Sequence, residues 1–238
     1  MSRRRINAIV RKELRDYRHN PYTLMTMAIV PLIFLLQPLI SVLSLPAGAS
    51  IPLSRHDQLL YMLGIPALVP ALVAASSIVT ERAQGTLEPV LATPIRRDEF
   101  VLAKALAPLV PSVLISYAVY AVFVVIIELF AQPGVAPALL KTPVVIAQIV
   151  FTPLIAAWSI WVGLAISTVA SDIRAAQQLS LLGNLPLVAL VVLVAFDVIE
   201  ASTALAVGLA AALLVGYRVG WRVVSALFDR ERLIANTR

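Results

Sequence analysis

The chain has 238 residues, of which 60% are hydrophobic and 13% are charged, and it carries a net charge of +6 without any cysteine. Soluble domains contain about 45–50% apolar and about 25% charged residues, so these figures exclude an ordinary soluble protein and indicate that lipid surrounds most of the chain. The absence of cysteine excludes disulfide scaffolds and thiolate metal sites.

Residues 1–23 come first and combine basic side chains with a helical pattern of apolar ones. The apolar side chains recur at spacings of three and four residues, at Ile6, Ile9, Val10, Leu14 and Tyr17. This spacing predicts an amphipathic helix that lies flat among the lipid headgroups.

Six apolar stretches are each long enough to cross about 30 Å of hydrocarbon as a helix, which takes roughly 20 residues. The predicted spans are Leu24–Leu45, Leu59–Val79, Val101–Ile127, Val144–Ala170, Leu179–Phe196 and Ala201–Val219. Only Asp197–Glu200 separates the last two, which predicts a tight helical hairpin. The fold class is therefore an all-α integral membrane protein with six transmembrane helices. After the last span, Trp221, Val224, Leu227 and Phe228 indicate a second amphipathic helix within the tail, residues 220–238.

The distribution of basic residues sets the orientation of the chain. Seventeen of the nineteen Lys and Arg residues lie on one side of the predicted spans, and only Arg55 and Lys141 lie on the other. Cytoplasmic segments carry the excess of basic residues, so both termini are predicted to be cytoplasmic. This arrangement explains the positive charge without a nucleic-acid partner and predicts a multi-pass membrane protein. We expect its location to be a bacterial or archaeal cell (inner or plasma) membrane.

The centres of the predicted spans contain no Asp, Glu, Lys, Arg or His. Lys104 comes closest, one turn inside the third span, and we expect its side chain to extend back to the cytoplasmic surface. Buried ionisable groups mark proton and ion pathways in membranes, so their absence argues against a proton-coupled transporter, a voltage sensor or an intramembrane protease.

Uncharged polar residues and small residues do occur in the spans. The polar candidates for lining a transport pathway are Gln37, Ser116, Tyr120, Gln148 and Asn184, although hydrogen bonds between helices are the commoner role of such residues. In the last span a small residue recurs at every fourth position, and this strip predicts close helix packing at Gly208, Ala212, Gly216 and Gly220.

The cytoplasmic segment 80–100, between the second and third spans, is the most informative part of the chain. Gly85 can end the preceding helix, and Thr86 can cap a short new helix with Glu88 in its first turn. Thr93-Pro94 repeats the capping signal and predicts the start of the helix that enters the third span. A short helix with a small apolar face fits a groove on another protein.

This segment resembles the signature of type-2 ABC transporter permeases (the ABC-2 family). The matching residues are Glu-Arg-x-x-Gly-Thr-Leu-Glu-Pro-x-Leu-x-Thr-Pro from Glu81 to Pro94, followed by Glu99 and Lys104. The resemblance implies that residues 1–23 form an elbow helix and that the segment after the second span is a coupling helix, which docks on a separate ATP-binding subunit. Its coupling positions would be Glu81, Arg82, Gly85, Thr86, Leu87, Glu88 and Pro94.

The resemblance also implies that the permease works as a homodimer or heterodimer with two copies of the ATP-binding subunit. No glycine in the chain is followed by lysine, so the chain contains no phosphate-binding P-loop. We therefore expect a non-enzymatic exporter subunit that binds no cofactor itself, with ATP and Mg bound by the partner. Two alternatives stay open: a haem-export subunit of cytochrome c maturation, and a secondary transporter or channel that acts without an ATPase.

Overall fold

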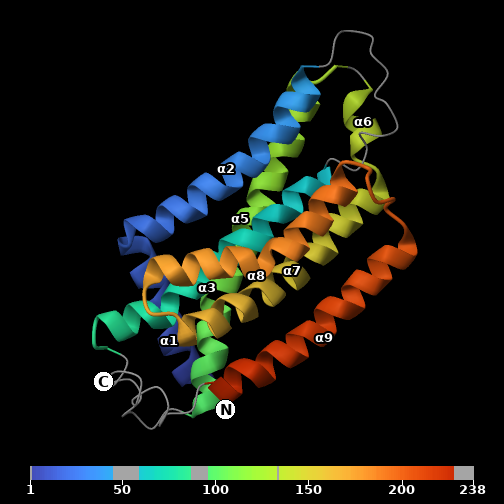
Figure 1. Ribbon diagram of the computed structural model, residues 1–238. Coiled ribbons are helices and arrows are strands. Elements are labelled where there is room, and N and C mark those ends of the chain that lie inside the picture. Colours follow the sequence, from blue (N-terminus) through green and yellow to red (C-terminus); the bar gives the residue numbers. More distant parts are fainter. Residues whose placement is uncertain (1, 45–58, 87–95, 133, 228–238) are drawn as a thin grey trace.

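The computed structural model of the protein describes residues 2–44, 59–86, 96–132 and 134–227, and the regular secondary structure in these ranges is helical (Figure 1). Six helices are long and apolar enough to cross a membrane, which confirms the predicted number of spans. The helices are α1 Arg3–His19, α2 Pro21–Leu43, α3 Gly64–Ala83, α5 Arg97–Phe130, α6 Val135–Leu139, α7 Thr142–Val169, α8 Ile173–Ala195 and α9 Thr203–Leu227.

Helix α5 is longer than the span predicted for it. Its 34 residues correspond to about 50 Å of helix at 1.5 Å per residue, compared with about 30 Å of hydrocarbon. It begins at Arg97 rather than at Pro94, because Arg96 has extended backbone angles and Glu99 accepts a hydrogen bond from the Arg96 backbone N–H. Pro94 itself lies outside the described residues. The short helix α6 follows α5 and was not predicted.

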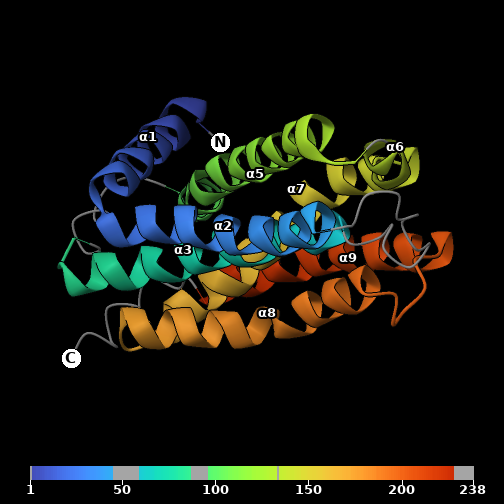
Figure 2. The same ribbon diagram turned by 90° about the horizontal axis from the view of Figure 1, so that it is seen from above.

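Helix α3 forms the centre of the bundle. It contacts α2, α5, α7 and α8 (Figure 2). Of its most hydrophobic stretch of 18 residues, 83% is buried inside the protein. Its approach to α7 is especially close at Gly163, where an added Cβ atom would collide with the backbone carbonyl oxygen of Ala71. Glycine is required at this contact because any side chain would push α3 and α7 apart.

Helices α8 and α9 do not form the predicted hairpin. The turn between them is short, with Asp197 in the left-handed region at φ +56°, but α9 then runs along α7 instead of α8 (Figure 1). Helix α9 also continues unbroken to Leu227. The prediction of a separate amphipathic helix after the last span is therefore wrong for residues 220–227, and Phe228 lies outside the described residues. Trp221 packs in this continuous helix against Trp161 of α7, with ring centroids 5.5 Å apart.

The small-residue strip of α9 serves two different surroundings. At Gly216 and Gly220 an added Cβ atom would meet the rings of Trp158 and Trp161, so these two glycines make room for the tryptophans of α7. At Gly208 an added Cβ atom would have no neighbour within 4 Å, and Ala212 is exposed. Gly216 and Gly220 therefore pack against α7 within the chain, whereas the described residues leave Gly208 and Ala212 exposed.

Candidate functional site

The predicted coupling segment begins where α3 ends, and this end has the geometry of a glycine-terminated helix. Gly85 has φ +66°, its N–H donates to the carbonyl of Arg82, and the N–H of Thr86 donates to the carbonyl of Glu81 at 2.9 Å. These two bonds form a Schellman motif, which satisfies the last carbonyl groups of a helix. Gly85 thus ends α3, as predicted.

The other predicted features of the segment lie beyond this point. The Thr86 hydroxyl donates back to the Glu81 carbonyl at 3.3 Å. Leu87, Glu88 and Pro94 fall outside the described residues, so the short coupling helix stays a prediction.

We expect Gly85→Ala to destabilise the protein by about 1 kcal/mol, because a left-handed backbone costs a residue with a Cβ atom about 1–2 kcal/mol. Thermal unfolding of the purified protein in detergent measures the effect. Gly208→Ala is the matched control: it places alanine in a regular helix with open space around it, and we expect it to be neutral or stabilising. Equal unfolding temperatures for the Gly85 variant and the wild type would contradict the role of Gly85.

Arg82, one residue after Glu81, connects the end of α3 to the end of α7. Its guanidinium group donates to the carbonyl of Thr168 at 2.7 Å and to the carbonyl of Ala170 at 3.1 Å. Both carbonyls belong to the last turn of α7 and its C-cap, where a helix favours positive charge. Arg82 is therefore a structural link between the C-terminal ends of two spans, α3 and α7.

Glu81 belongs to a buried charge network that joins three helices. The Nζ atom of Lys104 in α5 lies 3.0 Å from a Glu81 oxygen in α3 and 2.8 Å from a Glu13 oxygen in α1. Lys104, Glu13 and Glu81 are 1%, 4% and 5% exposed, respectively. The prediction that Lys104 reaches the cytoplasmic surface is therefore wrong, because the two carboxylates hold its ammonium group inside the protein.

Lys12 covers the outer side of the same network. Its Nζ atom donates to Glu81 at 2.6 Å and lies 3.9 Å from Glu13 and 4.0 Å from Asp16. Partial burial lowers the pKa of Lys12, but the hydrogen bond and charge of Glu81 outweigh this effect, so the pKa is raised. The ammonium group therefore stays charged at neutral pH and supports Glu81.

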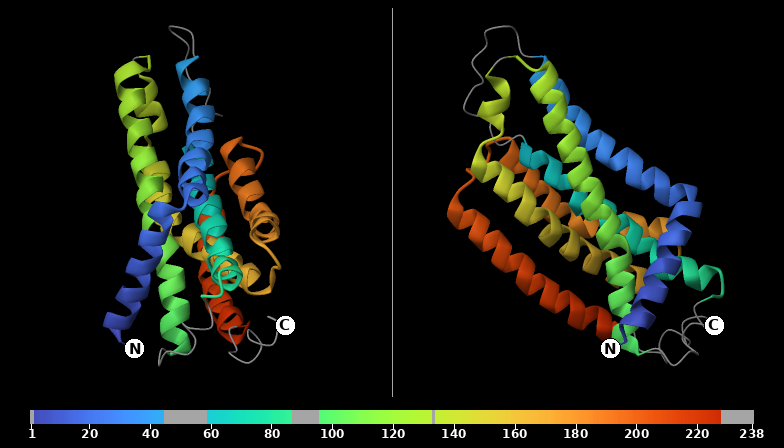
Figure 3. Two further views of the ribbon diagram at one scale, coloured as in Figure 1. Left: turned by 90° about the vertical axis from the view of Figure 1, so that its left-hand side faces the viewer. Right: turned by 180° about the vertical axis from the view of Figure 1, so that it is seen from behind.

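A second ionic contact fixes the start of α1. Glu99, in the first turn of α5, is 1% exposed and accepts a hydrogen bond of 2.6 Å from the Ser2 backbone N–H. The guanidinium group of Arg5 lies 3.5 Å from the other Glu99 oxygen. Helix α1 therefore begins beside the beginning of α5 (Figure 3).

The apolar stripe of α1 packs against protein. Leu14 and Tyr17 pack in a cluster with Val73 of α3 and Ala107 of α5, and Ile9 packs against a second cluster that includes Phe100. Within residues 1–23 the structure has the helix α1, Arg3–His19, whose apolar side faces α3 and α5, whereas residues 21–23 already belong to α2. Its location at the lipid headgroups stays a prediction.

The five candidate pathway residues lie on four different helices. Three of them are at most 1% exposed: Ser116, Gln148 and Asn184. The Ser116 hydroxyl and the Asn184 amide donate to carbonyl groups four residues earlier in their own helices. Both polar side-chain atoms of Gln148 are buried without a hydrogen-bond partner among the described residues, as are the Tyr120 hydroxyl and the Gln37 Oε1 atom. Their lining of a pathway stays a prediction.

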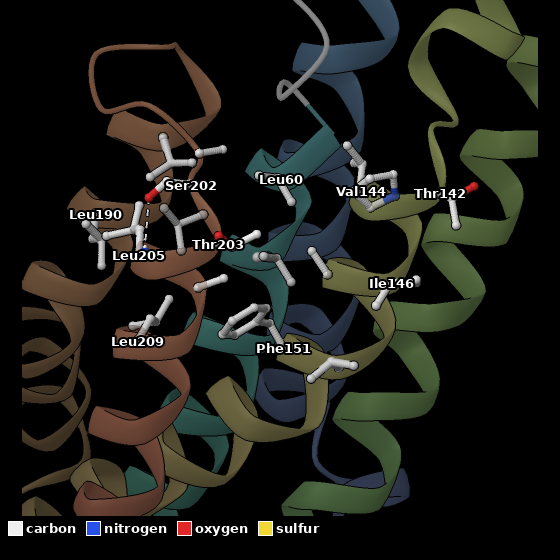
Figure 4. A pocket seen from close by; sticks show the side chains of 18 residues that line it. Leu60, Thr142, Val144, Ile146, Phe151, Leu190, Ser202, Thr203, Leu205 and Leu209 are labelled. Carbon is white, nitrogen blue, oxygen red and sulfur yellow. Dashed lines mark hydrogen bonds between the residues drawn. The ribbon is translucent and has the colours of Figure 1, made fainter.

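A separate apolar cavity of about 520 Å³ lies at the opposite end of the bundle, where α8 and α9 diverge (Figure 4). Leu205 and Leu209 of α9, Leu190 of α8 and Phe151 of α7 line it. None of the five pathway candidates belongs to its described lining. Sequence reasoning missed this cavity because it predicted that α8 and α9 pack together.

Comparison with known proteins decides the family. The family model described as ABC-2 type transporter matches residues 4–194, about four fifths of the chain. The chain belongs to this family. Among curated proteins, no relative matches the sequence. The ABC-2 match begins within α1 and ends within α8, so it includes every residue of the buried charge network and the whole segment 80–100. The chain is therefore a transporter permease subunit that spans the membrane several times.

Proposed function

We propose that this ABC-2 permease is the membrane subunit of an ATP-driven exporter in the cell membrane. Two permease copies form the substrate pathway. Two copies of a separate ATP-binding subunit drive transport by binding to the segment after α3. ATP and Mg bind to those partner subunits. Closure of the ATP-binding subunits moves the coupling segments as rigid elements and tilts the spans, which switches access to the pathway.

The observation that carries this proposal is the attachment of the coupling segment to the bundle. The segment begins in the last turn of α3, where Glu81 and Arg82 bind α1, α5 and the end of α7. A force on the segment therefore acts on four helices together. Because α3 is also the central helix of the bundle, movement of its cytoplasmic end reaches the packed core.

Coupling requires that the partner distinguish two states of the permease. A bound partner shifts a conformational equilibrium only through its different affinity for the two states. We propose that Leu87 and Glu88 make the contacts that differ between these states, because Leu87 supplies an apolar anchor and Glu88 supplies a charge at the start of the expected coupling helix.

We expect the double variant Leu87→Ala with Glu88→Ala to retain ATP hydrolysis by the assembled complex, while ATP-driven export falls about tenfold. This factor lies within the range of coupling free energies of about 1–3 kcal/mol. Export of a lipophilic fluorescent probe into inside-out vesicles and phosphate release measure the two activities. Unfolding of the variant at the wild-type temperature shows that the bundle is intact. Unchanged export would contradict the proposal, and probe flux without an ATP-binding subunit would favour a channel or secondary transporter.

A further inference from the structure

The outer face of α1 carries a stripe of arginine side chains. They follow one another at spacings of seven, four and three residues, which places them on one side of the helix, at Arg4, Arg11, Arg15 and Arg18. All of these arginines are exposed. From Arg4 to Arg18 the stripe is about 21 Å long at 1.5 Å per residue.

The stripe lies opposite the side of α1 that packs on the bundle. Successive residues of an α-helix are about 100° apart, so Arg15 lies about 160° around the helix from both Glu13 and Tyr17, which are buried. The two acidic residues of α1, Glu13 and Asp16, form their ion pairs with lysines. Within the described residues, the guanidinium groups of the stripe form no ion pair. The stripe is therefore a positively charged surface without internal neutralisation in the described part of the chain.

Helix α1 stays close to the level at which the spans begin. Asn20, with extended backbone angles, is the one residue between α1 and the span α2, and α1 turns away from the axis of α2 there (Figure 1). Ser2, at one end of α1, donates a hydrogen bond to Glu99, and Tyr17, near the other end, packs with Ala107. These two positions are only about 12 Å apart along α5, whereas α1 is about 25 Å long. Helix α1 therefore crosses the beginning of α5 obliquely.

The membrane boundary predicted from the sequence falls at the same level. The predicted third span begins at Val101, between the two positions at which α5 meets the ends of α1. Exposed apolar side chains begin directly after α1, at Leu24 and Met25 of α2. Tyr22, which precedes them, is also exposed, and tyrosine is enriched where lipid headgroups meet the hydrocarbon.

We propose that the arginine stripe of α1 is a binding surface for anionic phospholipids. It lies at the depth of the lipid phosphate groups, and guanidinium groups bind phosphate oxygens through two parallel hydrogen bonds. A zwitterionic lipid carries a cationic group beside its phosphate, so its net attraction to the stripe is weaker. An acidic protein surface would also attract the stripe, but the adjoining span holds α1 beside lipid whether or not a partner is bound. Because the apolar side of α1 packs on α3 and α5, the contact with lipid depends on charge.

The test uses the full chain without a partner, so it does not depend on the proposed export function. Ala8 is exposed and lies on the same face as the arginines, and Ala8→Cys gives a chain without other cysteines a single site for a fluorophore. The protein is placed in phosphatidylcholine nanodiscs that contain a small fraction of lipid with a nitroxide quencher near its headgroup. The quencher lipid is either phosphatidylglycerol, which is anionic, or phosphatidylcholine. We expect phosphatidylglycerol to quench about fivefold more strongly, which is the effect of one basic residue at an anionic surface, and the ratio to fall as salt rises.

Variants of the stripe make the test specific. Replacement of all the stripe arginines by glutamine should bring the quenching ratio to about one, whereas replacement by lysine should preserve most of it, because lysine keeps the charge. Arg174→Gln combined with Arg218→Gln is the matched control: it removes exposed arginines from α8 and α9, and we expect no change in the ratio. The substituted residues are all exposed, so the variants should unfold at the wild-type temperature.

Addition of the ATP-binding subunit to the nanodiscs distinguishes a lipid surface from a protein surface. A preference for phosphatidylglycerol that persists in the assembled complex supports the lipid surface. Loss of quenching by both lipids on assembly would show that the stripe binds the partner instead, and would overturn the proposal. Equal quenching by the two lipids in the wild-type chain, or an unchanged ratio in the glutamine variant, would also overturn it.

Discussion

Lys104→Met is expected to destabilise the protein by about 3–5 kcal/mol, because removal of one partner leaves the buried carboxylates of a charge network without compensation. Glu13 and Glu81 are almost fully buried, and Lys104 is the group that contacts both of them at 3.0 Å or less. Lys12 contacts Glu81 closely but lies 3.9 Å from Glu13, so it cannot replace Lys104 for both acids. Equilibrium unfolding in detergent measures the loss.

The matched variants separate the charge effect from packing. Lys104→Met combined with Glu13→Gln and Glu81→Gln removes the uncompensated charges, and we expect it to recover most of the lost free energy of unfolding, since replacement of a whole buried network is often nearly neutral. Arg11→Met removes an exposed basic residue of α1 and should change the free energy of unfolding by less than about 0.5 kcal/mol. A Lys104→Met protein as stable as the wild type would contradict the described network.

Arg82→Gln is expected to destabilise the protein by about 2–4 kcal/mol. Two hydrogen bonds from a charged donor to the carbonyls of Thr168 and Ala170 are lost, each worth about 1.5–3 kcal/mol, and glutamine can replace part of one of them. Hydrogen exchange should increase most in the last turn of α7 and the first turn of α8, because Arg82 bonds to the carbonyl groups at this end of α7.

Two further variants test the geometry of this link. Arg82→Lys keeps the charge but cannot reach two carbonyls in the same planar arrangement, so its stability should lie between those of the glutamine variant and the wild type. Arg218→Gln, at an exposed position of α9, should have little effect. If Arg82→Lys and Arg82→Gln were both as stable as the wild type, the contact with α7 would not matter energetically.

Hydropathy was sufficient to predict the spans because each helix needs about twenty apolar residues to cross the bilayer, whatever its neighbours are. The end of α3 was predictable for a similar reason: Gly85 is the residue that adopts the left-handed conformation most easily, and this preference is local. Pairing of helices was not predictable. Gly216 packs on Trp158, which lies almost sixty positions earlier in the sequence, and nothing in the turn at Asp197 indicates that α9 leaves α8.

The charge network shows where the sequence contained a signal that was not used. Glu13 lies among the apolar residues of α1, between Val10 and Tyr17 on the same helical face, and Lys104 lies among apolar residues of α5. An ionisable residue on an apolar face needs an oppositely charged partner, and these two residues have opposite charges. The identity of the third partner, Glu81, depends on the tertiary packing of α3 and could not be inferred from spacing.

Cysteine cross-linking tests the central claim most directly, because the chain contains no native cysteine to remove. A single Leu87→Cys variant, assembled with the ATP-binding subunit and treated with a short cross-linker, should link to that subunit in a yield that changes when ATP is added. Val198→Cys, at a 69% exposed residue in the turn at the opposite end of the bundle, should not link to it. Cross-linking from position 198, or the failure of position 87 to cross-link in an assembled and folded complex, would contradict a permease driven through the segment after α3.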